Sequence, residues 1–519
     1  MAIKVGGTTV IDDSRQLSNI TSVDATTVAA LGTAGVGAGG GSFDAVASGT
    51  LPDGTTVIVN SDGTVSAVSG SAFSQSVGPV NTASAIGFER PSAIYDTVSN
   101  KVIYAFKNGA NSDKGTIISG TVSGTTITFG SPYIYYNGSS GGPSICYDAS
   151  DNRIVIAFRD GGSGYGKIIN GTVSGTSFNF NSADSFNTAG TEHITAVYDP
   201  VAERTVVFYK DQGNGNTSTC RVLSLSGGSF TQGSEIIVGA GGEKYLFDSV
   251  YDPDSGKIIA VYTNADQSHR LAAVVATVSG LNVTFGSEAF ISAGNASEFN
   301  SVTYDTNAQK VVVVYRNTAA SNVSSAVGSV SGTSITFGTP IVVYGTSVNF
   351  VSISYDDNAK KVLVSYGDGG NSNKGTYHEG TVSGSSITFG SSIVFNVGDS
   401  LSYTPVVYDP DTQKSILAMW DGTTYGTNGG NLEANVISVS GVNSNLTDDN
   451  FIGFSDGGYT NGQTATIKTI SSVNDTQTGL TAGKRYHVAA DGTLSEPVPP
   501  GFNVFAGTAV SATEIIVKG

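Results

Sequence analysis

The chain has 519 residues, of which 68 are glycine and only 13% are charged. Its 25 basic and 42 acidic side chains give a net charge of −17, which repels phosphate backbones and argues against nucleic acid as a main partner. Because no stretch approaches the about 20 consecutive apolar residues of a membrane helix, we expect no membrane insertion.

The first 70 residues differ in sequence pattern from the repeats that follow. The opening MAIKVGGTTV lacks the apolar core of a secretory signal, and GTAGVGAGGG over residues 32–41 is typical of a flexible linker. TTVIVNSDGTVSAVSG follows over residues 55–70, and its SDG predicts a hairpin turn. We therefore expect a terminal segment with a glycine linker over residues 1–41 and a β-hairpin lead-in over 42–70.

Short phrases recur along the middle of the chain at a nearly constant period. A Tyr-Asp pair returns seven times, in steps of 51 to 53 residues, at Tyr95, Tyr147, Tyr198, Tyr251, Tyr304, Tyr355 and Tyr408. A basic residue follows each Tyr by six positions, at Lys101, Arg153, Arg204, Lys257, Lys310, Lys361 and Lys414. An Asn or Asp follows by thirteen, at Asn108, Asp160, Asp211, Asn264, Asn317, Asp368 and Asp421. This self-similarity indicates a repeat architecture of seven units.

Each unit reads as four short strands. The unit around Lys310 contains NSVTYD, KVVVVY, SSAVGSV and SITFGTPIVV, separated by turn-forming residues and without a competing helical pattern. The phrase VSGTSITFG at Val330, with relatives in the other units, predicts an outer hairpin whose Gly takes a positive φ. Four strands in about 50 residues fit one blade of a propeller. The sequence thus predicts an all-β protein with a seven-bladed β-propeller over residues 71–445.

The two ends of this array predict how the ring closes. In the seventh unit, the VSG at Val439 is not followed by a good copy of the fourth strand. A complete copy, VSGSAFSQSVGPV at Val68–Val80, stands ahead of the first unit. We expect residues 71–80 to pair within the seventh blade, because that pairing removes two open sheet edges. Residues 446–519 have strand alternation but no Tyr-Asp pair, and they predict a separate small β domain with a modest interior.

Acidic, histidine and cysteine residues are present, but their spacing does not match that of a metal site or a catalytic site. The Tyr-Asp residues and the following cations are expected to cap turns and pair across hairpins rather than bind a metal. The four histidines have no ligand spacing, so no metal and no cofactor is assigned. Cys146 and Cys220 are expected to be buried free thiols, although a disulfide remains the alternative.

The loops that break the repeat predict a binding site. In a four-stranded blade, the loop from second to third strand and the loop leading into the next blade emerge on one face. Aromatic platforms with nearby polar groups suit sugar rings. The alternative for each of these residues is packing between blades or against a sister subunit. The predicted binding residues on this face are Glu89, Arg90, Tyr136, Tyr165, Glu192, His193, Lys244, Tyr245, Glu298, Phe299, Asn349, Phe350, Tyr403, Trp420 and Tyr425, with Trp420 in an outward-leaning position.

A propeller enzyme acting on glycans is the main catalytic alternative. Such an enzyme needs paired carboxylates near the central opening. Three residues before each Tyr stand Ser92, Ser144, Thr195, Asp248, Ser301, Ser352 and Pro405, among which only Asp248 is acidic. We therefore expect no enzymatic activity.

Both ends of the chain carry a family resemblance. MAIKVGGTTVIDDSRQLSNITSVDATTVAAL resembles the N-terminal segment of tail-fibre and other virion structural proteins of contractile-tailed phages that infect marine cyanobacteria. FIGFSDGGYTNGQ, TGLTAGKRYHVAADGTLS and AGTAVSATEIIVKG resemble a small module near the ends of such proteins. The resemblance covers roughly a fifth of the chain and implies that the N-terminal segment joins the virion or its own trimer, while distal parts face the host. The seven-unit array departs from that family.

These observations predict a virion structural protein, as a tail fibre or receptor-binding protein. Its expected partners are other virion proteins, sister chains of a homotrimer, and a glycan or protein receptor on the host surface. Its expected place is the tail or particle surface, after assembly in the host cytoplasm. The alternatives are the glycan-active enzyme and a non-viral, lectin-like adhesin.

Overall fold

The computed structural model describes residues 3–5, 8–11, 41–71, 74–83, 86–292, 297–346, 348–397, 403–421, 430–440, 443–447, 449–496 and 504–518. The chain divides into two compact units, Ser74–Ser440 and Met1–Phe73 with Gly441–Gly519. The described residues form strands and short 3-10 turns but no α-helix, which confirms the all-β prediction. Within them, no helix is long and apolar enough to cross a membrane.

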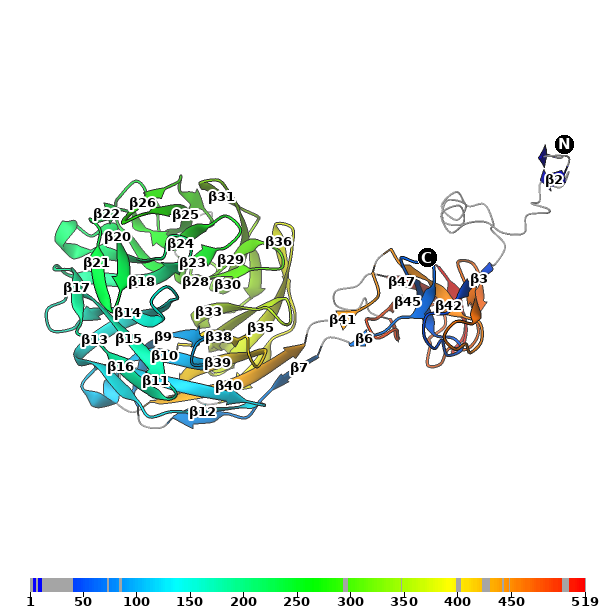
Figure 1. The fold of residues 1–519 in the computed structure, drawn as a ribbon, viewed down its shortest axis with the longest axis horizontal. Helices are drawn as coiled ribbons and strands as arrows, with labels where there is room; N and C mark the ends of the chain where they lie inside the picture. The colour runs from blue at the N-terminus through cyan, green and yellow to red at the C-terminus, as the bar shows by residue number, and fades with distance from the viewer. Residues whose placement is uncertain are drawn as a thin grey trace. The chain divides into compact units, whose positions relative to one another are not determined.

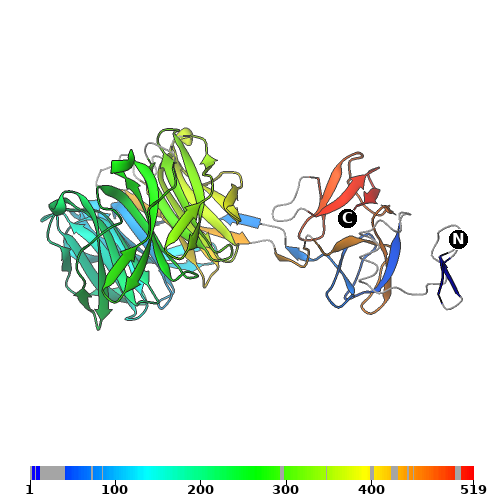
Figure 2. The same cartoon turned by 90° about the horizontal axis from the view of Figure 1, so that it is seen from above.

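In the unit Ser74–Ser440, antiparallel sheets follow one another around a ring (Figure 1). Figure 2 shows these sheets standing next to one another. The first strand of each repeat lies nearest the centre and ends at the Asp of the Tyr-Asp pair. These first strands are β9 (Phe88–Asp96), β13 (Tyr133–Asp148), β18 (Thr191–Asp199), β23 (Lys244–Asp252), β28 (Ser297–Asp305), β33 (Val348–Asp356) and β38 (Val406–Asp409).

The recurring residues of the sequence are the strand boundaries. Each second strand begins at the repeated Lys or Arg and ends at the repeated Asn or Asp, and each third strand ends at the Ser of VSG. The second strands are β10 (Lys101–Asn108), β14 (Arg153–Asp160), β19 (Arg204–Asp211), β24 (Lys257–Asn264), β29 (Lys310–Asn317), β34 (Lys361–Asp368) and β39 (Lys414–Asp421). The third strands are β11 (Lys114–Ser123), β15 (Gly166–Ser174), β20 (Thr217–Ser226), β25 (Arg270–Ser279), β30 (Asn322–Ser331), β35 (Lys374–Ser383) and β40 (Asn431–Ser440).

The outer strand of each repeat is split into two segments that pair with opposite ends of the third strand. The first segments are β12 (Thr126–Phe129), β16 (Ser177–Phe180), β21 (Ser229–Gln232), β26 (Asn282–Phe285), β31 (Ser334–Phe337) and β36 (Ser386–Phe389). The second segments are the start of β13, β17 (Asp184–Asn187), β22 (Ile236–Ile237), β27 (Ala289–Phe290), β32 (Ile341–Tyr344) and β37 (Ile393–Asn396). The VSG turns between the third strand and the first outer segment hold Gly at φ values of 56° to 61°, for example 60° at Gly124, as predicted.

The N-terminal side of the chain completes the last sheet. β7 (Ser74–Val77) and β8 (Asn81–Ala83) pair with opposite ends of β40, and Ser74 is the register partner of Ser440. The predicted closure is thereby confirmed. Hydrogen bonds also join neighbouring repeats: the Tyr95 hydroxyl donates to Asp411 Oδ2 of the seventh repeat at 2.8 Å, and Ser150 N donates to the Tyr198 hydroxyl at 3.2 Å.

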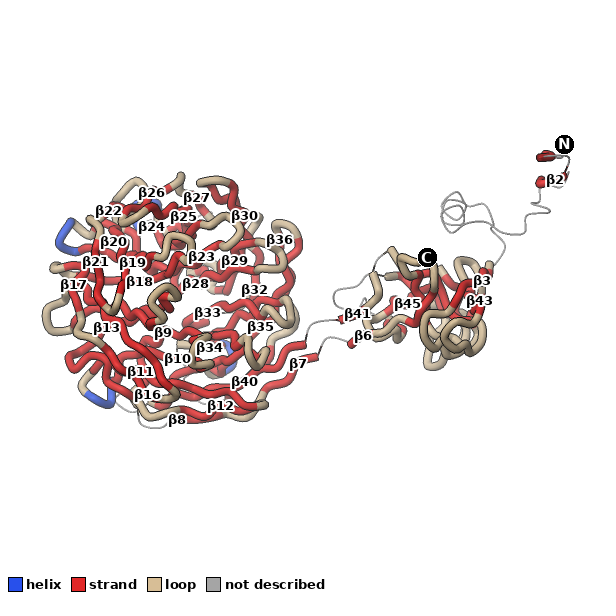
Figure 3. The backbone as a smooth tube through the Cα atoms, viewed as in Figure 1, coloured by secondary structure: helices blue, strands red, loops and turns tan. Residues whose placement is uncertain are grey.

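The recurring acid of each Tyr-Asp pair is buried and caps its own turn. Asp252 Oδ1 accepts hydrogen bonds from the backbone N–H groups of Asp254 and Ser255, at 3.0 and 3.2 Å. This capping role was predicted. Apolar clusters lie between successive sheets rather than in one central mass, as where Phe88 and Tyr104 of the first repeat meet Trp420 and Leu432 of the seventh. Short 3-10 turns η1 (Gly109–Asn111), η2 (Gln212–Asn214), η3 (Ala265–Gln267) and η4 (Gly369–Asn371) follow four of the second strands (Figure 3).

The second unit combines both ends of the chain. One sheet has the order β3 (Ser42–Val46), β43 (Thr464–Lys468), β42 (Phe451–Ser455), β4 (Thr56–Val59), β5 (Val65–Ala67). The other has the order β44 (Val473–Asn474), β48 (Ile515–Val517), β47 (Phe505–Ala509), β45 (Arg485–Val488), β46 (Leu494–Ser495). β6 (Gly70–Ser71) pairs with β41 (Asn443–Ser444).

This arrangement corrects the predicted division between a lead-in at 42–70 and a separate domain at 446–519. The lead-in supplies three strands of a shared sheet, and its Ile58 packs in one core with Phe454 and Ile515. The physical reason is the modest interior of residues 446–519, which the lead-in hairpin completes. Of the predicted segment 1–41, β1 (Ile3–Val5) pairs with β2 (Thr8–Ile11), and residues 12–40 lie outside the described residues.

Candidate binding site at the centre of the ring

A bulge interrupts the first strand of each of the first six repeats at the same position. In the first repeat Glu89 pairs with Lys107 while Ser92 pairs with Ala105, so extra residues are accommodated between them. The residue five positions before the Tyr adopts a left-handed conformation at Arg90 (φ 46°), Gly142 (51°), His193 (51°), Phe299 (48°), Phe350 (53°) and Tyr403 (52°). We call these six residues the bulge ring. A left-handed residue is a standard way to build a bulge, so the backbone shape belongs to the repeat.

The side chains of the bulge ring need a different explanation. The left-handed region costs a residue with a Cβ roughly 1–2 kcal/mol, and Gly142 shows that the repeat accepts Gly there. Five of the six described positions nevertheless keep Arg, His, Phe or Tyr. Strained residues of this kind cluster at functional sites. The variation of side chain on a constant backbone therefore marks this ring as the candidate site.

Three members of the bulge ring form a continuous aromatic surface, which we call the aromatic arc. The ring centroids of Phe299 and Phe350 are 4.6 Å apart, and those of Phe350 and Tyr403 are 4.3 Å apart. All three side chains are half-buried, so each leaves part of its ring accessible. Thr404 Oγ1 donates to the Phe350 carbonyl at 2.9 Å and ties two neighbouring repeats together beneath the arc.

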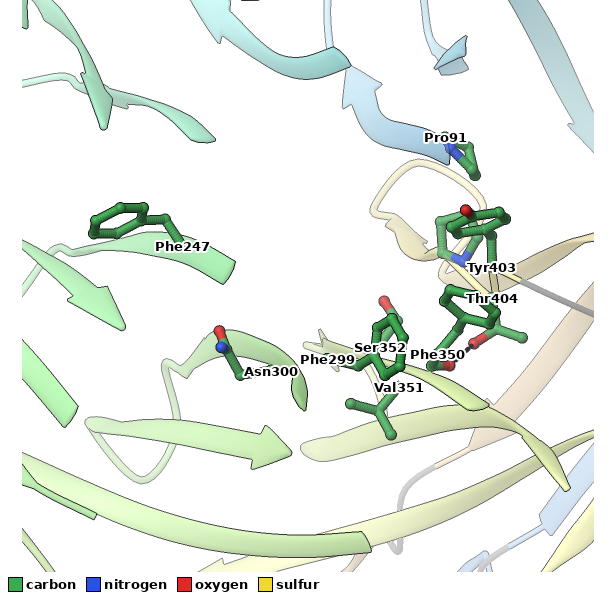
Figure 4. Close-up of a pocket in the computed structure, with 10 residues that line it drawn as sticks. Pro91, Phe247, Phe299, Asn300, Phe350, Val351, Ser352, Tyr403 and Thr404 are labelled. Atoms are coloured by element: carbon green, nitrogen blue, oxygen red, sulfur yellow. Dashed lines mark hydrogen bonds between the residues drawn. The ribbon is translucent and has the colours of Figure 1, made fainter. Parts of the chain in front are cut away.

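The arc lines an open pocket of about 260 Å³ at the centre of the ring. Figure 4 shows Tyr403 beside Pro91 and Phe350, with Phe247 across the open space. The pocket is lined by Pro91, Phe247, Phe299, Asn300, Phe350, Val351, Ser352, Tyr403, Thr404 and Pro405. This lining contains aromatic faces, hydroxyls and one amide but no charged side chain. It can stack against a ring with an apolar face and hydrogen-bond its hydroxyls.

Charged side chains occupy other repeats around the same centre. Lys107 Nζ contacts Glu89 Oε2 at 3.0 Å and Asp113 Oδ1 at 3.1 Å. Lys210 Nζ contacts Glu243 Oε1 at 2.7 Å and Glu192 Oε2 at 3.6 Å. The Glu89 and Glu192 pairs hold the start of a first strand against the end of its second strand.

Tyr245 lies between two histidines. Its ring centroid is 5.6 Å from that of His193 and 5.8 Å from that of His269, and its hydroxyl hydrogen-bonds His269 Nδ1. Burial lowers the pKa of His193, and the charges of Lys210 and Arg90 lower it further against the opposing effect of Glu192 and Glu243. His193 is therefore mainly neutral at pH 7. No cluster of three or more His, Cys, Asp and Glu suited to a metal ion occurs in the described part of the chain.

Asp248, the single acid at its repeat position, is buried and hydrogen-bonded to a neighbouring repeat. Burial raises its pKa to about 6, partly offset by hydrogen bonds from Val302 N and Ser249 N and from the Ser301 hydroxyl. Its Oδ2 accepts from Val302 N at 3.0 Å and so links the fourth repeat to the fifth. Ser92 and Ser144 bridge earlier repeats in the same way, through Ile145 N and Ala196 N.

The structure brings only part of the predicted binding set together. Phe299, Phe350 and Tyr403 meet at the pocket, and Glu89, Arg90, Glu192, His193 and Tyr245 lie at the bulges or just before them. Asn349 Nδ2 donates to Asn373 Oδ1 at 3.3 Å within its own repeat. Tyr136 packs on Phe158 with centroids 4.8 Å apart, while Tyr165 is 37% exposed in a loop.

Two predicted residues are not accessible. Trp420, which was placed in an outward-leaning position, is 1% exposed and packs between the first and seventh repeats. Lys244 is 2% exposed, donates to the Gly241 carbonyl, and lies over the Tyr262 ring, and burial lowers its pKa. Their large apolar or aliphatic surface is better used between sheets. Tyr425 and the Glu298 side chain lie outside the described residues.

Sequence reasoning missed other lining residues, among them Pro91, Phe247, Asn300 and Thr404. All four stand four positions before the Tyr of their repeat, directly after the bulge ring. Aligning the repeats on Tyr-Asp and asking which columns vary most would have found them. The two free cysteines, Cys146 and Cys220, are both buried, as predicted, and play no part in this site.

No protein-family model matches the chain, and no curated protein matches its sequence. Similar solved structures include AofleA from Arthrobotrys oligospora, with 10% identity over 67% of this chain and 97% of that chain and a TM-score of 0.40. An Aleuria aurantia lectin mutant in complex with Fucalpha1-6GlcNAc has 14% identity over 61% of this chain and 99% of that chain, with a TM-score of 0.38. A protein from Lactobacillus plantarum has 13% identity over 64% of this chain and 96% of that chain, with a TM-score of 0.43. These similarities are distant, and they carry no argument about ligand or activity.

Proposed function

We propose that residues 74–440 form a seven-bladed β-propeller that presents the aromatic arc to a saccharide on a cell surface. One observation carries the proposal: Phe299, Phe350 and Tyr403 are kept in a strained conformation around an open pocket where the repeat would accept Gly. Half-exposed aromatic faces beside hydroxyl and amide groups match the alternating apolar and polar faces of a sugar ring.

The resemblance of both chain ends supports the proposal that saccharide binding takes place on a virion. A protein similar at its ends to virion structural proteins of contractile-tailed cyanobacterial phages would serve as a tail fibre or receptor-binding protein on the particle. Its N-terminal segment would join other virion proteins or the sister chains of a homotrimer. Several copies on one particle would convert weak binding per copy into firm adsorption through multivalency.

The proposal contains no catalytic step. Hydrolysis of a glycoside by a propeller enzyme needs two carboxylates on either side of the scissile bond. The described lining of the pocket holds no Asp or Glu, and Asp248 is engaged by hydrogen bonds to the next repeat. A non-viral adhesin would use the same site. Finding the protein on a phage particle would distinguish the virion protein from this alternative.

The test compares three forms of the full chain in binding to cyanobacterial cells and to a panel of immobilised neutral oligosaccharides. Phe350→Ala with Tyr403→Ala should reduce binding at least tenfold, because stacking and the associated burial are lost. Tyr133→Ala is the matched control, since Tyr133 is a 37% exposed aromatic residue on the start of β13, outside the pocket. Unchanged binding by the double variant, with an unchanged melting temperature, would place recognition elsewhere.

A further inference from the structure

The repeats provide a matched comparison of one ion-pair position. The residue just before the bulge ring pairs in register with the residue near the end of the second strand. This places Glu89 opposite Lys107, Glu192 opposite Lys210 and Glu298 opposite Arg316. Among these pairs, Lys107 and Lys210 have their ammonium groups within 4 Å of the opposing Glu. A cation at this position is therefore normally neutralised by the strand beside it.

The second repeat keeps the cation and loses the acid. Arg159 pairs in register with Gly141, so no side chain stands where the first, third and fifth repeats have Glu. The guanidinium lies beside glycine: a Cβ on Gly164 would be 3.6 Å from Nη2, and a Cβ on Gly141 would be 4.0 Å from Cδ. Its Nε is buried without a hydrogen-bond partner. We call Arg159 with Gly141 and Gly164 the Arg159 notch.

The acids closest along the chain and in adjacent repeats are already engaged. Asp160 accepts hydrogen bonds from Gly162 N at 3.1 Å and from the Ser163 hydroxyl at 2.6 Å. Glu89 and Asp113 of the first repeat contact Lys107. Glu192 of the third repeat and Glu243, which directly precedes the first strand of the fourth repeat, contact Lys210. In the described part of the chain, no ion pair neutralises Arg159. This is notable in a protein whose net charge is −17.

One further cation and one imidazole stand in the repeats next to the notch. Arg90 and His193 stand at the bulge-ring positions of the repeats on either side, and both are exposed. His193 adds a polar imidazole that can donate one hydrogen bond even when neutral. A planar guanidinium beside a further cation is suited to an oxyanion, which it can hold through two parallel hydrogen bonds.

We propose that the Arg159 notch binds an anionic group, a carboxylate or a sulfate ester, on an acidic saccharide. The identity of the ligand as a saccharide rests on the proposed function, whereas the anion site rests on the notch itself. The ring would then offer two kinds of contact, an uncharged aromatic arc and a cationic notch, on different repeats. A saccharide that carries acidic groups along its length could use both.

The first experiment measures binding of the full chain by titration calorimetry to three oligosaccharides of equal length: an oligogalacturonate, a sulfated galactan and the same galactan without sulfate. One of the anionic ligands should bind more tightly than the neutral one, and added NaCl should weaken that ligand most. Preference for galacturonate assigns a carboxylate, and preference for the sulfated ligand assigns a sulfate ester. Equal affinity for all three overturns the proposal.

The second experiment uses the repeat as its own control. Arg159→Gln should weaken binding of the preferred anionic ligand about tenfold or more, because a hydrogen-bonded charge contact is lost. Lys107→Gln changes the equivalent cation, which Glu89 and Asp113 already neutralise, and should leave anion binding nearly unchanged. Wild-type affinity in Arg159→Gln contradicts the proposal.

The third experiment restores the missing acid. Gly141→Glu recreates the Glu of the first, third and fifth repeats, and its Cβ would lie at an ordinary 3.6 Å from Arg159 Cβ. It should abolish the anionic preference, whereas Gly141→Gln fills the same space without charge and should retain most of it. Melting temperatures of both variants show whether the fold is intact. If neutral oligosaccharide binding still depends on Phe350 and Tyr403 while these variants have no effect, the notch proposal fails and the proposed function stands.

Discussion

The two units of this chain assemble their sheets in opposite ways. In Ser74–Ser440 nearly every strand pairs with a neighbour in sequence, and only β7 and β8 come from a distance. In the second unit, β3 pairs with β43 and β4 with β42, so that Phe43 meets Ile467 and Val57 meets Gly453. Because the first unit is repetitive, its strand pairing can be predicted from local sequence patterns. The strand pairing of the second unit depends on contacts that form only after the two ends of the chain meet.

Ring closure itself brings those ends together. The register that pairs Ser74 with Ser440 leaves residues 71 and 443 close in space, and Ser71 indeed pairs with Asn443. The entropy cost of closing a loop grows only slowly with loop length. Here, closure of the ring already brings the two ends together, so the second unit does not bear this cost again. The second unit then forms between segments that are already adjacent.

The largest expected effect comes from removing one of the two ends. A chain that stops at Ser440 loses β42 and β43, so β3 loses its sheet partner and β4 keeps only β5. We expect scanning calorimetry to show that the transition of the second unit disappears while that of the ring persists. Proteolysis within residues 42–70 should become rapid. Survival of a folded 42–70 segment in this shortened chain would break the comparison.

Single core substitutions should separate the two units. Trp420→Ala removes a fully buried side chain from the ring, and Phe454→Ala does the same in the second unit. Each should lower the stability of its own unit by about 3–5 kcal/mol and leave the other transition in place. The measurement is calorimetry of both variants, with Trp420→Phe as a milder control. Because Trp420 is buried, any loss of cell binding in Trp420→Ala should follow the loss of stability.

The two units should respond to pH with opposite signs. In the ring, burial raises the pKa of Asp248 to about 6 and that of Glu379 to about 7. The folded ring therefore holds these protons more tightly than the unfolded chain, and its stability should fall as the pH rises from about 4 to about 7. The double variant Asp248→Asn with Glu379→Gln should flatten this slope, which melting temperatures across the range would show.

In the second unit the shifted exposed carboxylates act the other way. Hydrogen bonds from Thr64 lower the pKa of Asp62, and the hydrogen bond from Lys468 lowers that of Asp475. Their contribution is present at neutral pH and is lost as the pH falls through the lowered values. The melting temperature of this unit should therefore decline only under acidic conditions. A parallel response of both transitions would contradict the assignment.

The smallest expected effect concerns the hydrogen bond that joins the first repeat to the seventh. Tyr95→Phe removes the donor to Asp411, a partly exposed contact at 2.8 Å, and should cost about 0.5–1.5 kcal/mol. Only the ring transition should shift. Tyr165→Phe serves as a control, because Tyr165 is an exposed loop residue far along the chain from the closing seam. An equal shift in both variants would mean that the Tyr95 hydroxyl does not secure the closure.

Sequence patterns predicted much of the ring and less of the site. The recurring Lys or Arg and Asn or Asp proved to be the bounds of the second strands, because charged and turn-forming residues stand where an apolar run meets solvent. The aromatic and charged residues that break the repeat were predicted as the binding set, and that set includes Phe299, Phe350 and Tyr403. Trp420 and Lys244 were misplaced because local alternation cannot say whether a side chain meets solvent or the next sheet.

The repeat period, the strand boundaries, the VSG hairpins and the N-terminal completion of the seventh unit could be predicted from the residues alone, since all of these follow from local turn chemistry and from copies of one pattern. Three other features became known from the folded chain: which varying side chains share the central pocket, that Arg159 stands opposite a glycine instead of a glutamate, and that residues 42–70 belong with residues 443–518. Those outcomes depend on the register between strands and on packing between sheets, and neither is written in the order of residues along one strand.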